Sequence, residues 1–451
     1  MTEPADPLAA FIVAACAPLD SGHSSGTLER AQAILAEHPD VARGSIHAAA
    51  ILGDAAAVRR FLKADASSAT AKGGPHGWDA LTHLCFSRYL KLHRKRSKGF
   101  VRAATALLDA GANANTGWFE HNHQPTAEWE PALYGACGIA HHPEMTRLLL
   151  ERGANPNDGE VVYHSPETYD NAALEILVEL GKPSKENLSL MLIRKHDFHD
   201  YEGAKLLLER GADPNGSRER GWYPMHHALA RDNALRMFEL LLEHGADPML
   251  KSDGLTAVAR AAREGRSDVL GLVQRRGTSI ALDGVDGLIA ACACDDSDAV
   301  RAIVQGQPQL VAELRTMGGV LLARFAGTGN PGGVRQLLDL GVDVRTPFTE
   351  GDGYWGMAKG SLAIHVAAWR LQHAVVKLLL DRGSPVDVPD ERGRTPLALA
   401  VRACVDSYWT ELRSTRSVAA LLRAGASTEG VLYPSGYAAV DRLIRKRRGE
   451  S

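Results

Sequence analysis

The chain has few aromatic residues and few cysteines for its length. Its 451 residues include 9 Phe, 7 Trp and 10 Tyr, or 6% aromatic residues, whereas 45% of the chain is hydrophobic. The apolar surface must therefore come mainly from Ala, Leu and Val, as in small, tightly packed helices. Six cysteines are too few for a disulfide scaffold in a chain this long. We expect them to be reduced and buried.

Long apolar runs and an excess of charge of one sign are also missing. The longest apolar stretch near the start, residues 8–17, follows acidic rather than basic residues and is about half of a bilayer span. The 51 Lys and Arg nearly balance the 54 Asp and Glu, for a net charge of −3, so a general polyanion-binding protein is not favoured. We expect a cytoplasmic protein with no membrane segment and no secretory signal.

A run of leucines followed by Gly recurs along the chain. Copies end at Gly111, Gly153, Gly211, Gly245, Gly341, Gly383 and Gly425, and a weaker one ends at Gly277. In each copy the leucines would bury one side of a helix, and a glycine in the left-handed conformation would end it. The Asp, Asn and Pro residues that often follow favour a turn. Each copy therefore predicts a helix and the turn after it.

An Ala-rich segment precedes several of these leucine runs and predicts a second helix. It is clearest at residues 361–368 and 395–400, where Thr395 before Pro396 is a good helix N-cap. The helix pair, the period near 33 residues and the Thr-Pro-Leu-His-x-Ala pattern resemble the ankyrin repeat. Residues 44–428 carry the resemblance, which implies an all-α solenoid of about eleven helix-turn-helix repeats. The signature histidine is matched by His47, His226 and His365.

The two ends are predicted to cap this array, because terminal repeats of a solenoid would otherwise expose apolar faces. Residues 1–43 would form an N-terminal capping helix pair, and residues 429–451 a C-terminal capping helix with a basic tail. The array itself would span residues 44–428. Its least regular part is residues 158–200, where the first helix of a repeat is hard to find.

Five insertions break the period of the array. Two fall inside helix pairs, at residues 87–99 and 406–417, and three are expected in the finger loops between repeats, at 116–131, 158–171 and 345–361. The first contains six bases and no acid, which suits an acidic partner or phosphate. A solvated helix extension is the favoured explanation, because short basic runs are common surface features.

The scarce aromatic residues collect in the fingers. By resemblance, fingers line one edge of the concave face of an ankyrin array, where rigid rings are good binding anchors. The alternative is that long fingers fold over and use the rings as small cores of their own. The candidate partner-binding residues are Trp118, Phe119, Trp129, Tyr163, Tyr169, Trp222, Tyr223, Tyr354 and Trp355.

Catalytic and metal motifs are weak. His121, His123, His164 and Asp170 are the residues to examine for a metal, but no His-Glu-x-x-His motif accompanies them. The glycine-rich residues 327–333 have no lysine or strand beside them and are expected to form the turn between paired helices. No Gly-x-Ser-x-Gly elbow occurs. We therefore predict no catalytic site, no metal and no cofactor.

These observations predict a monomeric, non-catalytic scaffold that binds one protein or peptide on its concave face, with nucleic acid an unlikely partner. Two alternatives stay open. One is nucleic-acid or polyanion binding through the basic residues 88–98 and 445–448. The other is a metal-binding protein or metal-dependent enzyme built on the long fingers.

Overall fold

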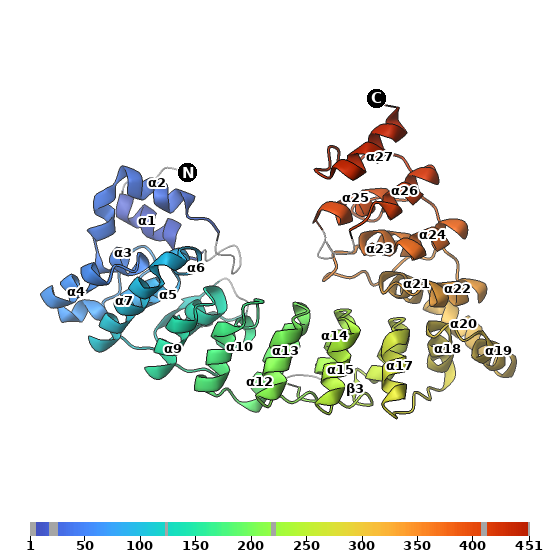
Figure 1. The fold of residues 1–451 in the computed structure, drawn as a ribbon, viewed down its shortest axis with the longest axis horizontal. Coiled ribbons are helices and arrows are strands. Elements are labelled where there is room, and N and C mark those ends of the chain that lie inside the picture. The colour runs from blue at the N-terminus through green and yellow to red at the C-terminus, as the bar shows by residue number, and fades with distance from the viewer. Residues whose placement is uncertain (1–5, 18–25, 122–124, 218–221, 407–412, 450–451) are drawn as a thin grey trace. The chain divides into compact units, whose positions relative to one another are not determined.

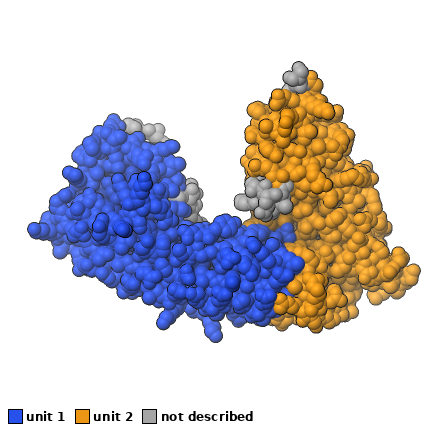
Figure 2. All heavy atoms as spheres, viewed as in Figure 1, with its two compact units in different colours: residues 1–246 blue, residues 247–451 orange. Residues whose placement is uncertain are grey.

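The computed structural model describes residues 6–17, 26–121, 125–217, 222–406 and 413–449. These residues form a succession of short helices with two small antiparallel hairpins (Figure 1). They divide into two compact units, residues 1–246 and 247–451, drawn blue and orange in Figure 2. The expected all-α repeat solenoid is confirmed. Among the described helices, none combines the length and apolar composition that a membrane crossing needs.

In unit 1 the first helices of successive pairs stack on one another. We call them the first-helix row; α3 packs against α5, α10 against α12 and α12 against α14. Small residues such as Ala48 and Ala80 are fully buried in this row and allow the close approach. The row consists of α3 (Ile46–Ile51), α5 (Ala80–Cys85), α8 (Ala132–Tyr134) with the π-helical turn η4 (Gly135–Ile139), α10 (Gly159–His164), α12 (Lys185–Asp197) and α14 (Pro224–Ala230).

The leucine-rich helices of unit 1 form a second row. Here α4 packs against α7, and α9 lies between α7 and α11. Leu107, Leu149 and Leu207 are fully buried, as the leucine pattern predicted. The row consists of α4 (Ala55–Ala64), α7 (Ser97–Asp109), α9 (Pro143–Glu151), α11 (Ala172–Ile176) with η5 (Leu177–Gly181), α13 (Tyr201–Glu209) and α15 (Leu235–Glu243).

Several shorter elements complete unit 1. The chain begins with α1 (Pro7–Ala15), α2 (Glu29–Glu37) and η1 (Pro39–Arg43), and α1 packs on α2 and α3. The remaining elements are η2 (Ala66–Ala69), α6 (Arg88–Leu92), η3 (Arg94–Arg96) and the strands β1 (Gly117–Glu120) and β2 (Glu128–Pro131). The basic insertion thus forms α6, η3 and the first residues of α7.

Unit 2 repeats the same arrangement. Its helix pairs are α16 (Ala257–Arg263) with α17 (Ser267–Arg275), α18 (Gly284–Ala293) with α19 (Ser297–Gly306), α21 (Gly318–Gly327) with α22 (Pro331–Asp339), α23 (Ala363–Trp369) with α24 (His373–Asp381), and α25 (Pro396–Asp406) with α26 (Arg416–Arg423). Three further elements are the hairpin β3 (Lys251–Ser252) and β4 (Leu255–Thr256), the extra helix α20 (Gln309–Thr316), and α27 (Ala438–Arg448) at the C-terminal end. The turn between α21 and α22 lies within the glycine-rich residues 327–333, as expected.

The repeated glycines end their helices in the way that the sequence predicted. The eight glycines that follow the leucine runs have φ between +80° and +99°. A residue with a Cβ is strained in this conformation, so glycine is favoured at each helix end. The glycines that recur in the sequence therefore also share the left-handed conformation that ends a helix.

Two expectations about local structure are wrong. Residues 158–171 are not a finger, because α10 forms there with Asp158 as its N-cap, and the residues after α10 make the turn to α11. Val161 and Val162 of α10 disfavour a helix locally because they are β-branched. Both are fully buried in the first-helix row, and this packing stabilises the helix. Cys294 is exposed at the end of α18, whereas the other described cysteines are buried and all are unbridged.

A buried ion pair fixes the irregular repeat at residues 158–200. Lys195 of α12 is completely buried, and its Nζ donates to the Thr168 carbonyl oxygen at 2.7 Å and to Asp200 Oδ2 at 2.8 Å. Asp200 also accepts from the Gly203 amide at the start of α13 and from Asn171 Nδ2. Burial lowers the pKa of Lys195, while Asp200 opposes that shift. The pair therefore connects three successive segments of the chain.

We expect Lys195→Met to lower the free energy of unfolding by about 3–5 kcal/mol, because Asp200 is left as a buried charge without its cation. Urea unfolding followed by far-UV circular dichroism measures the effect. Lys205→Met is the matched control, because Lys205 is about half exposed and lies 3.8 Å from Glu209. Equal losses in the two variants would contradict the structural role of Lys195.

Candidate functional site

The finger at residues 116–131 is an antiparallel hairpin with two chemically different faces. Trp118 pairs with Glu130, Phe119 with Trp129, and Glu120 with Glu128. Residues opposite one another lie on the same face, and successive residues alternate between faces. One face therefore carries Trp118 and three glutamates, and the other carries the rings of Phe119 and Trp129. The sequence pattern predicted a finger loop here, and this alternation is the signal that could have indicated the hairpin.

The face with Trp118 packs on the protein. The Trp118 ring stacks on Trp78 with centroids 5.1 Å apart, and it meets Phe86 edge-on at 5.8 Å. Trp78 and Phe86 are buried. Trp118 is half-buried among these rings, so the self-packing alternative applies to it.

The opposite face of the hairpin points to solvent. The Phe119 side chain is 54% exposed and contacts the half-buried Trp129 edge-on, with centroids 4.8 Å apart. An exposed phenyl ring held on a paired strand loses little conformational freedom on binding. Phe119 therefore has the accessibility that a binding anchor needs.

A strip of aromatic and charged side chains continues along α10, α12 and α14. Arg194 of α12 lies 4.0 Å over the ring of Tyr163 on α10 and pairs with Asp197. His227 of α14 contacts Asp197 at 2.8 Å, and Trp222 Nε1 donates to His227 at 2.7 Å. We call these five residues the α10–α14 strip. Their interactions are continuous, so the strip is pre-organised; His227 is buried in it, and Tyr163 is its exposed member.

The His227–Asp197 pair is not arranged as a general base. Nδ1 of His227 accepts from Trp222, and the Nε2 side contacts Asp197. Burial lowers the pKa of His227 although Asp197 raises it, so the ring is neutral, with one nitrogen protonated. Arg231 also binds Asp197 at 2.6 Å. Both ring nitrogens are therefore engaged, and neither is left to accept a proton from a substrate.

The other aromatic candidates have different surroundings. Tyr169 is 71% exposed in the turn after α10, and its hydroxyl donates to the Phe198 carbonyl oxygen at 2.7 Å. Tyr223 is half-buried at the N-cap of α14. Tyr354 belongs to unit 2 and is 37% exposed, with its ring edge-on to Trp355.

Trp355 is buried, in contrast to the expectation that it lies in an accessible finger. It is 7% exposed and belongs to a core cluster with Phe348 and Met357, which come from the same finger. The Arg370 guanidinium lies 4.4 Å from the centre of the Trp355 ring. The Trp355 carbonyl oxygen accepts a hydrogen bond from Trp369 Nε1. The finger at residues 345–361 therefore folds over its own core, because burying a Trp ring there removes a large apolar surface from water.

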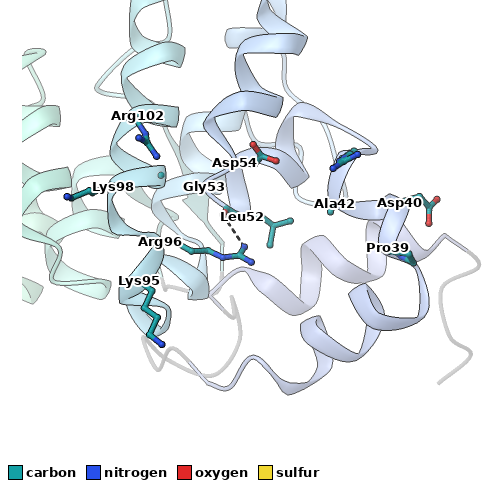
Figure 3. A pocket seen from close by; sticks show the side chains of 12 residues that line it. Pro39, Asp40, Ala42, Leu52, Gly53, Asp54, Lys95, Arg96, Lys98 and Arg102 are labelled. Carbon is teal, nitrogen blue, oxygen red and sulfur yellow. Dashed lines mark hydrogen bonds between the residues drawn. The ribbon is translucent and has the colours of Figure 1, made fainter.

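The basic insertion divides into two parts. Arg88 and Arg94 donate to the carbonyl oxygens of Ala14 and Ala140. The later residues border an open hollow of about 1020 Å³, formed by segments within 39–43, 52–54 and 95–102. Its charged lining residues are Arg43, Lys95, Arg96, Lys98 and Arg102 with Asp40 and Asp54. In Figure 3 Arg96 reaches toward Leu52, whose carbonyl oxygen it contacts at 3.3 Å, whereas Lys95 and Lys98 extend away from Leu52.

The comparison with protein families decides what kind of array this is. A family model for ankyrin repeats, in three copies, matches residues 190–283, which include α13 to α17. These residues are ankyrin repeats. Ankyrin repeats are generally protein–protein interaction domains, and they are typically non-catalytic.

Several known proteins are similar to a part of this chain. An ankyrin repeat and LEM domain-containing protein 1 homolog from Caenorhabditis elegans is 37% identical over 87 residues, 19% of this chain and 12% of the relative. Serine/threonine-protein kinase 12 of Arabidopsis thaliana is 38% identical over 84 residues, which are 19% of this chain and 16% of the relative. The 2-5A-dependent ribonuclease of Homo sapiens is 40% identical over 79 residues, which are 17% of this chain and 10% of the relative. The match spans less than a fifth of each relative.

Among the residues that the structure describes, those singled out for a metal do not come together. His123 lies outside the described residues, and Asp170 caps the turn before α11 through a bond from the Ala172 amide. His164 lies 3.1 Å from carboxylates on both sides, from Glu160 and from Glu167. In the described ranges, the one group of three His, Cys, Asp or Glu residues close enough to share a metal is Glu128, Glu130 and Glu160. The sequence search for histidines missed this group.

His164 carries a charge that its two neighbours hold in place. Burial lowers the pKa of His164, but the hydrogen bonds that the ring donates to the carboxylates of Glu160 and Glu167 raise it by more, to about 9. Its pKa in the unfolded chain is about 6.5. The stability that the charged ring provides is therefore complete below about pH 6.5 and is lost as the pH rises through about 9.

We expect His164→Gln to cost on the order of 3 kcal/mol at about pH 6 and much less at about pH 10. Urea unfolding of parent and variant across this range measures the difference. An NMR titration of the parent ring supplies the direct check, with a midpoint near 9. His38→Gln, at a half-exposed position beside Glu37, is the control. A difference that does not depend on pH would contradict the assignment.

Proposed function

We propose that unit 1 is a non-catalytic module that binds a protein or peptide partner. Its binding surface consists of the outer face of the hairpin, the α10–α14 strip and Tyr169. The observation that carries the proposal is the exposure of three rings that the fold holds in place: Phe119 at 54%, Tyr163 at 37% and Tyr169 at 71%. Ankyrin repeats are generally protein–protein interaction domains, which supports it.

The rings would supply most of the affinity. Each buries a large apolar area on contact and has few rotatable bonds, so little entropy is lost. Tyr163 is also held from one side by the Arg194 guanidinium. A partner segment with apolar side chains at the rings would therefore bind a surface that needs little reordering.

The charges of the strip would contribute to selectivity more than to affinity. Arg194 already pairs with Glu167 and Asp197, and Arg231 pairs with Asp197. These arginines therefore already have carboxylate partners within the protein. Their internal pairing penalises a partner that would desolvate them without replacing the contacts.

We further propose that the protein acts as a cytoplasmic monomer. Residues 1–43 and 429–451 would cap the array between them. The packing of α1 on α3, and of α26 on α27, supports this division, because each terminal helix covers the repeat beside it.

A second candidate function is anion binding at the hollow beside η3. Five bases and two acids line it, and this excess of positive charge favours a phosphate or an acidic segment. Lys95 and Lys98 extend outward and are accessible. The following experiment separates the two candidates.

We expect Phe119→Ala, Tyr163→Ala and Tyr169→Ala together to abolish capture of a partner that the parent retains. The captured proteins would be identified from the source lysate, and the candidate partner would be purified and titrated by calorimetry. We expect the removal of each anchor ring to cost about 2 kcal/mol or more of binding free energy, which weakens the affinity at least about 30-fold per ring.

Two control variants make the result specific. Leu180→Ala and Leu432→Ala remove side chains of comparable exposure, 40% and 47%, outside the proposed surface. They should leave binding unchanged. If the triple variant keeps its fold and its affinity, the proposed surface is wrong. Loss of binding in Lys95→Glu/Lys98→Glu instead, with a steep dependence on salt, would favour the anion site.

A further inference from the structure

Three glutamates meet where the hairpin contacts the first-helix row. Glu128 and Glu130 belong to β2, Glu160 belongs to α10, and β2 packs against α10. One carboxylate oxygen from each residue lies within 4.8 Å of the other two. Glu128 is exposed, Glu160 is half-buried and Glu130 is buried. The group therefore extends from solvent into the protein.

The buried member lacks a partner for one of its oxygens. Glu130 is 2% exposed, and its Oε1 makes no hydrogen bond. A buried carboxylate oxygen without a partner is costly, because it has lost its water and gained nothing in exchange. Such an oxygen inside a group of carboxylates points to a missing positive charge.

The surroundings of Glu130 are rich in negative charge. The carboxylates of Glu160, Glu120 and Glu128 all act on Glu130, and His164 is the cation that opposes them. His164 lies 3.1 Å from Glu160 Oε2 and is shared with Glu167. One imidazolium thus faces a larger number of carboxylates.

We propose that Glu128, Glu130 and Glu160 bind one hard divalent cation of the Ca²⁺ or Mn²⁺ type. Oxygen ligands select hard cations, and a Ca²⁺ ion lies about 2.3–2.6 Å from each of its ligands. Ligand oxygens on opposite sides of such an ion are about 5 Å apart, so oxygens within 4.8 Å of one another fit around a single ion. Water completes the coordination on the exposed side of Glu128.

This site goes beyond partner binding and has a structural consequence of its own. The ion would join β2 to α10, which are about thirty residues apart in sequence. The two segments already pack side by side, and the ion would add a direct link between their side chains. It would hold the hairpin, and with it the exposed ring of Phe119, in a fixed position on the first-helix row. Binding of the ion does not require that the hairpin binds a partner.

The test uses Mn²⁺ alone with the full chain. Isothermal calorimetry, and the loss of the free Mn²⁺ signal in electron paramagnetic resonance, measure binding directly. We expect one ion per chain with a Kd between about 1 μM and 1 mM, competition by Ca²⁺, and a rise in melting temperature when the ion is added.

Variants of the three glutamates assign the ion to this site. Glu130→Gln keeps the shape of the side chain and removes its charge, so it should weaken Mn²⁺ binding at least about tenfold. Glu128→Gln changes an exposed residue and serves as the variant whose fold is not at risk. It should weaken binding in the same direction. Glu202→Gln, exposed on α13, is the matched control and should bind as the parent does.

Two results would overturn the proposal. One is a parent protein that takes up no Mn²⁺ at concentrations up to about 1 mM, the weak end of protein Ca²⁺ sites. The other is uptake that Glu130→Gln and Glu128→Gln leave unchanged, which would place the ion elsewhere. Neither result bears on partner capture by the rings, so the two proposals fail independently.

Discussion

Every feature of this protein depends on one constraint: a helix pair of about 30 residues cannot bury its apolar faces alone and must pack on the pairs beside it. Ala-rich first helices therefore stack in one row and leucine-rich second helices in another. A left-handed glycine ends eight of the second helices and turns the chain toward the next pair. Polar interactions occur only where the rows leave room for them.

The α10–α14 strip shows what such a scaffold allows. Three consecutive first helices each place polar side chains on the same side, so Tyr163, Arg194, Asp197 and His227 form a continuous series of contacts. No loop has to be ordered for this to happen. The interactions satisfy one another, which makes the surface rigid and leaves the flanking rings as its accessible apolar part.

The hairpin shows a different use of the same scaffold. Alternation along two strands sends Trp118 and the glutamates toward the protein and the rings of Phe119 and Trp129 away from it. The side that faces the protein concentrates negative charge beside α10, and the opposite side presents apolar surface. One face of the finger thus packs on the protein and carries the charged residues, and the other face exposes apolar rings. The expectation of a simple binding loop did not distinguish these two faces.

The sequence by itself determined the repeat, the helix ends and the all-α class, because leucine spacing and left-handed glycines act locally. It did not reveal α10, because two valines and no Ala-rich pattern disguise a helix that packing stabilises. Only the tertiary structure decided which rings are accessible: Trp355 is buried in its own finger, while Phe119 is exposed. It also decided that Glu128, Glu130 and Glu160 converge, since two come from a strand and the third from a helix about thirty residues later. Burial and convergence depend on contacts between distant segments, and no local pattern specifies those contacts.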